Sequence, residues 1–302
     1  LGEVIDGLNM LIENPDCTLD EMMEHIKGPD FPTGGIIMGR AGIRSAYATG
    51  RGKITLRANA TIEEIKGRSC IIVNEIPYMT NKARIIQNIA NLVKEKRIDG
   101  IHFIRDESDR DGMRIVIELK RDAIPQIVLN KLYRYTQLQD TVGVIMLALV
   151  NGEPKVLTLK QVLEEYLKFQ VEVITNRTKF ELRKLREREH ILQGLAIAVD
   201  NLDEVIKICR SSKNLQDVKD VLSERFSLSQ IQAEAIARMQ LYQLSNMERQ
   251  KIIDELADIE AKIAELEAIL ADENKVYQII MEELAEIRRK FSDDRRTQIE
   301  TR

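Results

Sequence analysis

The chain has 302 residues, of which 44% are hydrophobic and 4% aromatic, and its 45 Lys and Arg residues against 49 Asp and Glu residues give a formal net charge of −4. This length accommodates two or three domains with hydrophobic cores. No run of about 18 apolar residues occurs, which excludes a transmembrane helix.

The cysteines Cys17, Cys70 and Cys209 are widely spaced and form no CxxC pair. This pattern argues against a disulfide framework or a zinc site and indicates a reducing compartment. We therefore expect a cytoplasmic protein without a metal site. The charged, amphipathic first helix is not a signal peptide. Because the sequence begins with Leu1 and not with Met, we expect it to be a piece of a longer protein.

The first half of the chain is predicted to be mixed α/β. A helix is expected over residues 1–12, and Thr18 and Glu21 have the spacing of a capping box that opens a second helix. Alternating apolar residues predict strands, and apolar residues three and four apart predict helices. The expected strands are 53–62, 69–76, 102–105, 113–120, 142–150 and 154–157, and the further helices are 43–49, 81–96 and 125–135. Their order predicts one sheet with helices on one face.

The pattern changes near Thr158, after which the chain has a single glycine, Gly194, and no proline. Apolar residues then recur every three or four positions in two seams typical of coiled coils. The seams are Leu192, Leu195, Val199, Leu202 and Ile206, and Ile252, Leu256, Ile259, Ile263, Leu266 and Leu270. We expect a long helix over 159–210, short helical pieces over 214–245, a return helix, and a last helix over 276–291. The predicted fold is α+β: an α/β domain over 1–158, and over 159–302 an antiparallel helical arm with a knob at its tip.

A basic segment stands out between Phe31 and Ile62, where no acidic residue occurs. It carries the cations Arg40, Arg44, Arg51, Lys53 and Arg57, interleaved with glycines. Glycines allow close backbone approach and guanidinium groups pair with phosphate, so the segment predicts contact with a nucleic-acid backbone. The alternative is a solvated surface segment without a partner. Some of these cations are also expected to pair with acids such as Glu63 or Glu64.

Another stretch, from Glu107 to Glu118, has nearly the carboxylate and glycine spacing of a calcium-binding EF-hand loop. An EF-hand requires a helix on each side. Here the flanking residues alternate as strands do, and Asp109 to Gly112 have the composition of a hairpin turn. We therefore predict a hairpin and no calcium site.

Ordered motifs along the whole chain resemble the A subunit of bacterial type IIA DNA topoisomerases, with DNA gyrase as the nearer branch and topoisomerase IV as the alternative. The motifs are Gly28–Arg40 (GPDFPTGGIIMGR), Ala46–Lys53 (AYATGRGK), Glu75–Tyr78, Arg105–Asp109, Leu129–Tyr133 and Arg295–Thr297. The resemblance implies that residues 1–158 are a tower domain that binds double-stranded DNA. It implies that residues 159–302 are a coiled-coil arm whose knob, 212–245, forms the exit gate of a homodimer.

The apolar cluster Met239, Leu241, Tyr242 and Leu244 is the expected dimer interface, because a surplus apolar patch at a tip marks an interface. The resemblance also implies an A2B2 complex with a B subunit, which binds ATP and Mg²⁺; no cofactor is expected in this chain. No membrane partner is expected. The stretch Met239–Leu244 departs from the usual gyrase pattern toward topoisomerase IV.

The family cuts DNA with a tyrosine that lies in an Arg-Tyr-Thr motif of a winged-helix domain ahead of the tower. The residues Arg134, Tyr135 and Thr136 repeat these three letters. They fall within the part that resembles the tower, so we interpret Tyr135 as a coincidence whose ring packs beside Leu132, and we expect no catalytic residue in the chain. A different class of function remains open, a structural coiled-coil dimerisation protein without a DNA role. The basic segment argues against this alternative.

Overall fold

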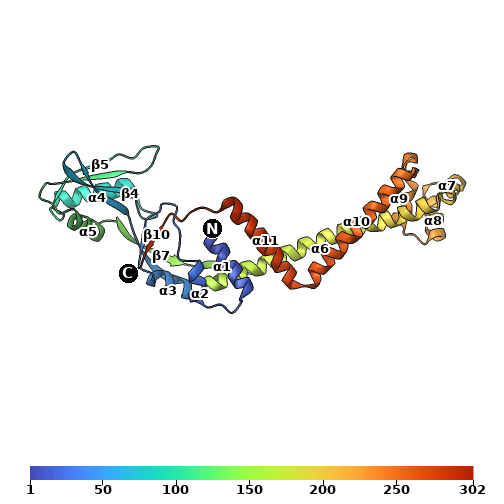
Figure 1. Ribbon diagram of the computed structural model, residues 1–302, viewed down its shortest axis with the longest axis horizontal. Coiled ribbons are helices and arrows are strands. Elements are labelled where there is room, and N and C mark those ends of the chain that lie inside the picture. The colour runs from blue at the N-terminus through green and yellow to red at the C-terminus, as the bar shows by residue number, and fades with distance from the viewer. Residues whose placement is uncertain (302) are drawn as a thin grey trace. The chain divides into compact units, whose positions relative to one another are not determined.

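The computed structural model describes residues 1–301, with all side chains except those of Leu241 and Tyr242. The chain divides into two compact units (Figure 1): residues 1–167 together with the segment from Leu284 onward, and Lys168–Glu283. The segment from Leu284 onward belongs to the first unit because a strand near the C-terminus, β10 (Gln298–Glu300), pairs in parallel with β1 (Ile36–Met38). Neither of these short strands was predicted.

The first unit contains two four-stranded sheets. The first sheet has the order β10-β1-β2-β7, where β2 is Arg51–Arg57 and β7 is Gln139–Ile145. The second sheet has the order β3-β4-β6-β5 and is antiparallel throughout. Its strands are β3 (Asn59–Ile65), β4 (Arg68–Glu75), β5 (Ile101–Asp106) and β6 (Ile115–Leu119).

The predicted single strand over 53–62 and the predicted single sheet are therefore wrong. The alternation of side chains continues from β2 into β3, but the backbone leaves the first sheet at Ala58, whose N–H donates to the carbonyl of Leu138 at 2.7 Å. Alternation reports only that a residue is extended, not which strand it pairs with. The predicted strand 142–150 divides similarly at Met146, because β7 pairs with β2 while β8 (Leu147–Val150) pairs with β9 (Glu153–Val156). The β8–β9 turn at Asn151 and Gly152 has positive φ at both residues, as a two-residue hairpin requires.

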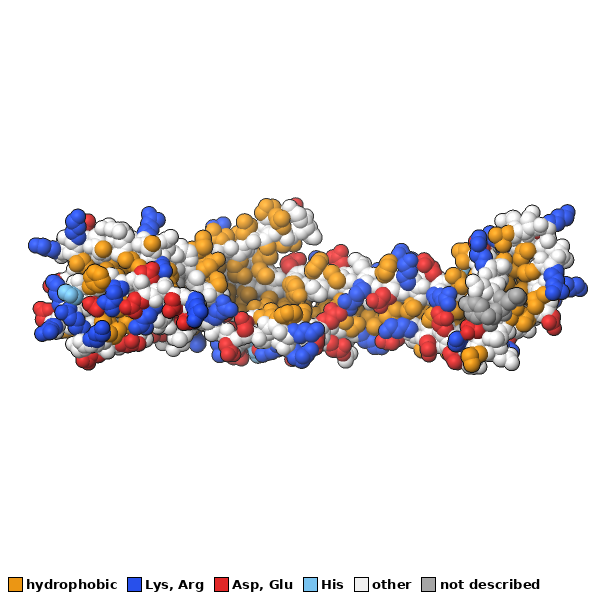
Figure 2. All heavy atoms as spheres, turned by 90° about the horizontal axis from the view of Figure 1, so that it is seen from above, with side chains coloured by type: hydrophobic (Ala, Val, Ile, Leu, Met, Phe, Trp, Pro, Cys, Tyr) orange, Lys and Arg blue, Asp and Glu red, His pale blue; other side chains and the backbone are white. Residues whose placement is uncertain are grey.

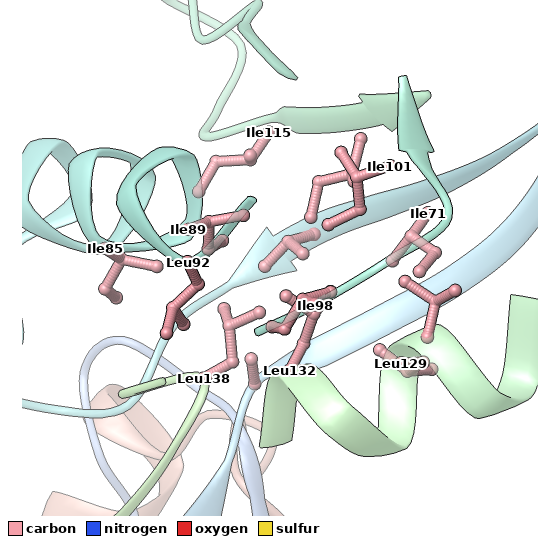
Figure 3. Close-up of a cluster of buried hydrophobic side chains, with 14 of the residues drawn as sticks. Ile71, Ile85, Ile89, Leu92, Ile98, Ile101, Ile115, Leu129, Leu132 and Leu138 are labelled. Atoms are coloured by element: carbon pink, nitrogen blue, oxygen red, sulfur yellow. The ribbon is translucent and has the colours of Figure 1, made fainter. Parts of the chain in front are cut away.

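The helices of the first unit agree closely with prediction. They are α1 (Gly2–Glu13), α2 (Leu19–His25), α3 (Ala41–Thr49), α4 (Lys82–Lys94) and α5 (Pro125–Tyr135). The hydroxyl of Thr18 caps α2 by accepting the N–H of Glu21. One face of the second sheet is covered by α4 and α5, and their contact forms the main core (Figure 3). This core includes Ile71, Ile115, Ile85, Ile89, Leu92, Ile98, Leu129, Leu132 and Leu138.

The second unit is helical and starts within the long helix α6 (Leu159–Asp200). This helix ends ten residues before the predicted end, and α7 (Leu202–Ser211) follows after Asn201. Then come α8 (Leu215–Phe226), α9 (Gln230–Ala237), the short 3₁₀ helix η1 (Leu241–Leu244), α10 (Asn246–Ala271) and α11 (Glu273–Phe291). The short helical pieces predicted over 214–245 and the return helix are confirmed. In Figure 2 hydrophobic side chains of this unit lie among charged ones along its helices.

Ion pairs show that α6 and α10 run antiparallel. Arg186 pairs with Glu267, Arg188 with Glu255 at 2.9 Å, and Asp200 with Arg249 at 2.5 Å. The residue number of the partner on α10 falls as the residue number on α6 rises, which is the pattern of antiparallel helices. The second predicted seam contributes Ile259, Ile263, Leu266 and Leu270 to a cluster with Leu182 and Leu185.

The first predicted seam is interrupted at Asn201. From this seam Leu195 contacts a separate cluster, which joins the end of α6 to α7, α8 and α9. Its buried members are Ala198, Val205, Ile208, Val218, Leu222, Leu228, Ala233 and Ile236. A heptad pattern does not show whether a helix packs against one long helix or against several short helices, because both kinds of contact require an apolar residue every three or four positions. Among the described residues no helix has the length and apolarity needed to cross a membrane.

Candidate nucleic-acid interface

Glycines of the basic segment allow α3 to lie directly on β2. A Cβ at Gly42 would be 2.1 Å from the carbonyl oxygen of Lys53, and a Cβ at Gly52 would be 2.7 Å from the backbone nitrogen of Ala46. Gly50 ends α3 with φ of 81°, a conformation that favours glycine. The glycines thus serve a close helix–strand contact, which carries the neighbouring cations on rigid backbone.

Arg51 and Lys53 are two residues apart on β2 and therefore share one face of the first sheet. Both side chains are exposed, and neither forms an ion pair with any described residue. Opposite them on β7 lie Ile145 and Gly143, which are exposed as well. This face presents two exposed positive charges that form no ion pair, an arrangement suited to phosphate contact.

Arg40 and Arg44 lie at the start of α3 and are both exposed. Arg40 has no ion pair among the described residues. Arg44 pairs with Asp20 of α2, and this hydrogen bond and charge hold the pKa of Asp20 below its ordinary value. The acid that compensates the basic segment is thus Asp20 and not the expected Glu63 or Glu64.

Arg57 has a structural environment that differs from the other four cations. Its Nε and Nη2 donate to the Oε1 atom of Gln139 at 2.9 and 2.7 Å, and its guanidinium lies 4.2 Å from the ring centroid of Tyr133. Burial raises the pKa of Tyr133, and the charge of Arg57 opposes that rise. Because Arg57 is half-buried and engaged, Arg40, Arg51 and Lys53 are the predicted DNA-binding residues that remain available.

The motifs from distant parts of the sequence meet in a junction within the first unit. Gly35 donates its N–H to Glu75 at 2.5 Å, and Asn59 donates to the other oxygen of Glu75 at 3.2 Å. Thr297 is fully buried; its hydroxyl accepts the N–H of Phe31 at 2.8 Å and donates to the carbonyl of Gly34 at 2.9 Å.

The guanidinium of Arg295 completes the junction. It forms two hydrogen bonds of 2.9 Å with Glu3 and donates to the carbonyls of Gly28 and Pro29. Burial of Glu3 raises its pKa, but the hydrogen bonds from Arg295 and from the N–H of Lys27 outweigh that effect and leave the pKa below its ordinary value. Of these residues, Gly28, Gly35, Glu75, Arg295 and Thr297 lie in the motifs noted in the sequence, whereas Glu3 and Asn59 lie in none of them. No local pattern marked these residues as hydrogen-bond partners, because the contacts join segments far apart in the chain.

Tyr135 ends α5, and its side chain is 41% exposed, so the expected burial of its ring beside Leu132 is wrong. The ring at the helix end extends past the core, while Leu132 is buried. The guanidinium carbons of Arg97 and Arg134 each lie 5.5 Å from its centroid. Its lack of a catalytic role stays a prediction.

The stretch with EF-hand-like spacing forms a hairpin, as predicted. Glu118 lies on β6 and pairs with Arg105 of β5, and Asp109 and Gly112 bridge at the turn. Hydrogen bonds from Arg105 hold the pKa of Glu118 below its ordinary value. Within residues 1–301 no three His, Cys, Asp or Glu side chains lie together as a metal site would require.

The predicted dimer residues fall near η1. Met239 and Leu244 are half-buried, whereas the side chains of Leu241 and Tyr242 lie outside those described. Two exposed apolar residues in this part of the chain were not singled out in the sequence, Ile231 at 62% and Met247 at 73% exposed. Both lie close to a helix start, where single apolar residues carry no periodic signal.

Comparison with known proteins gives one consistent result. The family model that describes the A subunit of DNA gyrase/topoisomerase IV matches residues 1–285. The DNA gyrase A subunit of Clostridium acetobutylicum is 58% identical over 301 residues, which are 99% of this chain and 36% of that protein. The DNA gyrase A subunit of Halalkalibacterium halodurans is 57% identical, with 99% and 36% covered. That of Synechocystis sp. is 54% identical, with 99% and 35% covered. The chain spans about a third of the length of the curated relatives it matches.

Proposed function

The chain belongs to the family of DNA gyrase/topoisomerase IV A subunits, and from this premise we propose that it is the tower and exit-gate part of the DNA breakage-reunion subunit of DNA gyrase. The complete enzyme would change DNA supercoiling by ATP-dependent passage of one duplex through another. It would be an A2B2 complex in the cytoplasm, whose B subunit binds ATP and Mg²⁺.

In this proposal the first unit is the tower and holds duplex DNA through its phosphates. The observation that carries it is the set of exposed, unpaired cations Arg40, Arg51 and Lys53 on the rigid α3–β2 pair. In a chain with a net charge of −4, such a set has no structural use that the contacts reveal. Contacts of this kind position a duplex without reading its bases.

The second unit is proposed to be the arm, with α6 and α10 as the antiparallel coiled coil and residues 212–245 as the knob. Two copies would join through Met239, Leu241, Tyr242 and Leu244. A stiff helical pair with a small apolar contact at its end keeps two subunits joined and still allows them to part. We also propose that Tyr135 does not act as a nucleophile. A nucleophilic tyrosine needs a base and a phosphate aligned by cations or a metal, and the groups around this ring are the two arginines.

The test is a duplex-binding measurement with the set Arg40→Glu, Arg51→Glu and Lys53→Glu. A plot of the logarithm of the binding constant against the logarithm of the salt concentration should become less steep by about 0.9 for each phosphate contact that is lost. The matched control reverses the exposed residues Lys207, Arg210 and Lys213 of the second unit, with the same change in net charge. The proposal fails if the two sets lower duplex affinity equally, or if the unaltered chain does not bind duplex DNA. The latter result would favour a structural dimerisation protein.

Topoisomerase IV is the second candidate, and the stretch Met239–Leu244 favours it. The two are separated by the activity of the complete enzyme on plasmid DNA. Negative supercoiling of relaxed plasmid is expected for gyrase, and decatenation without supercoiling would assign the chain to topoisomerase IV.

A further inference from the structure

The exposed ring of Tyr135 lies near two guanidinium groups. The Cζ atoms of Arg97 and Arg134 are each 5.5 Å from its centroid, so they are no more than about 11 Å apart, twice that distance. Both arginine side chains are exposed, and neither has a carboxylate partner among residues 1–301. Two unpaired cations thus share one aromatic ring.

The core of the first unit places the three residues. Ile98, one residue after Arg97, is buried in the core that Figure 3 shows. Leu132, three residues before Tyr135, is buried in the same core. The N–H of Arg97 donates to the carbonyl of Leu92 at 2.9 Å, after Lys96 has turned the chain with φ of 56°. The ends of α4 and α5 are therefore anchored, and the side chains beyond them face solvent.

Stability alone does not account for this arrangement. An exposed cation–π contact contributes about 0.5–1 kcal/mol, and like charges close to one ring oppose it. The exposed residues Lys94 and Lys96 add two cations to the same helix end. The acids next to them in sequence are Glu95 and Asp99, and Asp99 already pairs with Lys120. An anionic partner would relieve the repulsion among these cations.

We propose that Arg97, Tyr135 and Arg134 form a second phosphate-binding platform for duplex DNA, separate from Arg40, Arg51 and Lys53. This inference rests on the proposed DNA-binding function. The guanidinium groups pair with phosphate oxygens and the tyrosine hydroxyl donates a hydrogen bond to one, with no bond made or broken. Tyr135 is a binding residue here. Its ring faces guanidinium groups and so is not free to stack with an unpaired base, which favours a duplex over a single strand.

The experiment measures binding of a short fluorescent duplex by the whole 302-residue chain over a salt series. The double variant Arg97→Gln/Arg134→Gln removes up to two phosphate contacts. The plot of log binding constant against log salt concentration should therefore become less steep by up to about 1.8, and affinity at low salt should fall several-fold. Tyr135→Ala should weaken binding more than Tyr135→Phe, because it removes both the hydroxyl and the surface that orients the arginines. The control Arg110→Gln/Arg121→Gln removes two other exposed arginines of the same unit and should have little effect.

The inference is wrong if the double variant and the control bind alike while the unaltered chain binds DNA. If the unaltered chain does not bind duplex DNA, the proposed function falls as well. Inorganic phosphate and chloride at equal ionic strength should displace the duplex equally. If phosphate displaces the duplex selectively, and the double variant loses this selectivity, the three residues form a site for a free anion and the proposed duplex-binding role is wrong. Thermal unfolding of each variant confirms that its fold is intact.

Discussion

The carboxylate of Glu75 accepts a hydrogen bond of 2.5 Å from the backbone N–H of Gly35. Glu75 ends β4 of the second sheet, and Gly35 directly precedes β1 of the first sheet, so this contact joins the two sheets of one unit. Gly34 and Gly35 have φ of 72° and 85°, which turns the backbone N–H toward the carboxylate. Two glycines and one carboxylate therefore help to hold the first sheet against the second.

Gly34→Ala should strongly destabilise the chain. A Cβ at Gly34 would lie 1.5 Å from Oε2 of Glu75, and the positive φ adds strain of about 1–2 kcal/mol. The matched control is Gly67→Ala, where φ is 78° but no atom lies within 4 Å of the added Cβ. Urea unfolding should show a larger loss for Gly34→Ala. Equal losses would mean that Glu75 moves aside without consequence.

Arg57→Ala should lower the free energy of unfolding by about 1–2 kcal/mol, because it removes two hydrogen bonds to Gln139 and the contact with Tyr133. Arg51→Ala, on the same face of β2, should change stability by less than about 0.5 kcal/mol because its side chain is exposed and unpaired. If Arg57→Ala and Arg51→Ala lower the free energy of chemical unfolding equally, the assignment of Arg57 to structure and Arg51 to binding is wrong.

Glu3→Gln should reduce the dependence of stability on acid pH. The pKa of Glu3 in the folded chain is below its ordinary value of 4.5, so its ionised form stabilises the fold above that pH, and this contribution is lost as the pH falls through the folded pKa. Between about pH 5 and pH 3 the unaltered chain should therefore lose more unfolding free energy than Glu3→Gln. Glu95→Gln, at an exposed carboxylate, is the control and should follow the unaltered chain. Parallel pH curves for all three would contradict the role of the Arg295–Glu3 pair.

Met239→Asp should shift the chain from dimer to monomer in sedimentation velocity, with at least a roughly tenfold weaker dimer, because an unpaired carboxylate in an apolar interface is costly. The control is Ile253→Asp on α10, outside the proposed knob, where the side chain is 41% exposed. A dimer that withstands Met239→Asp but not Ile253→Asp would place the interface on the helical arm. A monomeric unaltered chain at tens of micromolar would exclude the knob dimer.

Local pattern was sufficient for most elements of this chain. The helix over Pro125–Tyr135, the turn between Asp109 and Gly112, and the change to helices near Thr158 follow from side-chain spacing and turn residues. The family followed from ordered motifs, which depend on residue identity alone. These signals are readable because each reflects interactions within a few residues.

Only the tertiary structure decided which elements pair and which charges remain free. The predicted strand 53–62 divides between two sheets at Ala58, because its hydrogen-bond partners are distant in sequence and leave no trace in a periodic pattern. The long helix stops at Asn201, and the apolar residues that follow pack in a cluster with α8 and α9, which the same periodicity does not reveal. Likewise Arg44 and Arg57 lie in the same acid-free segment as Arg51. Asp20 and Gln139, 24 and 82 residues away from their partners, determine that these two arginines are engaged while Arg51 and Lys53 remain open to a phosphate.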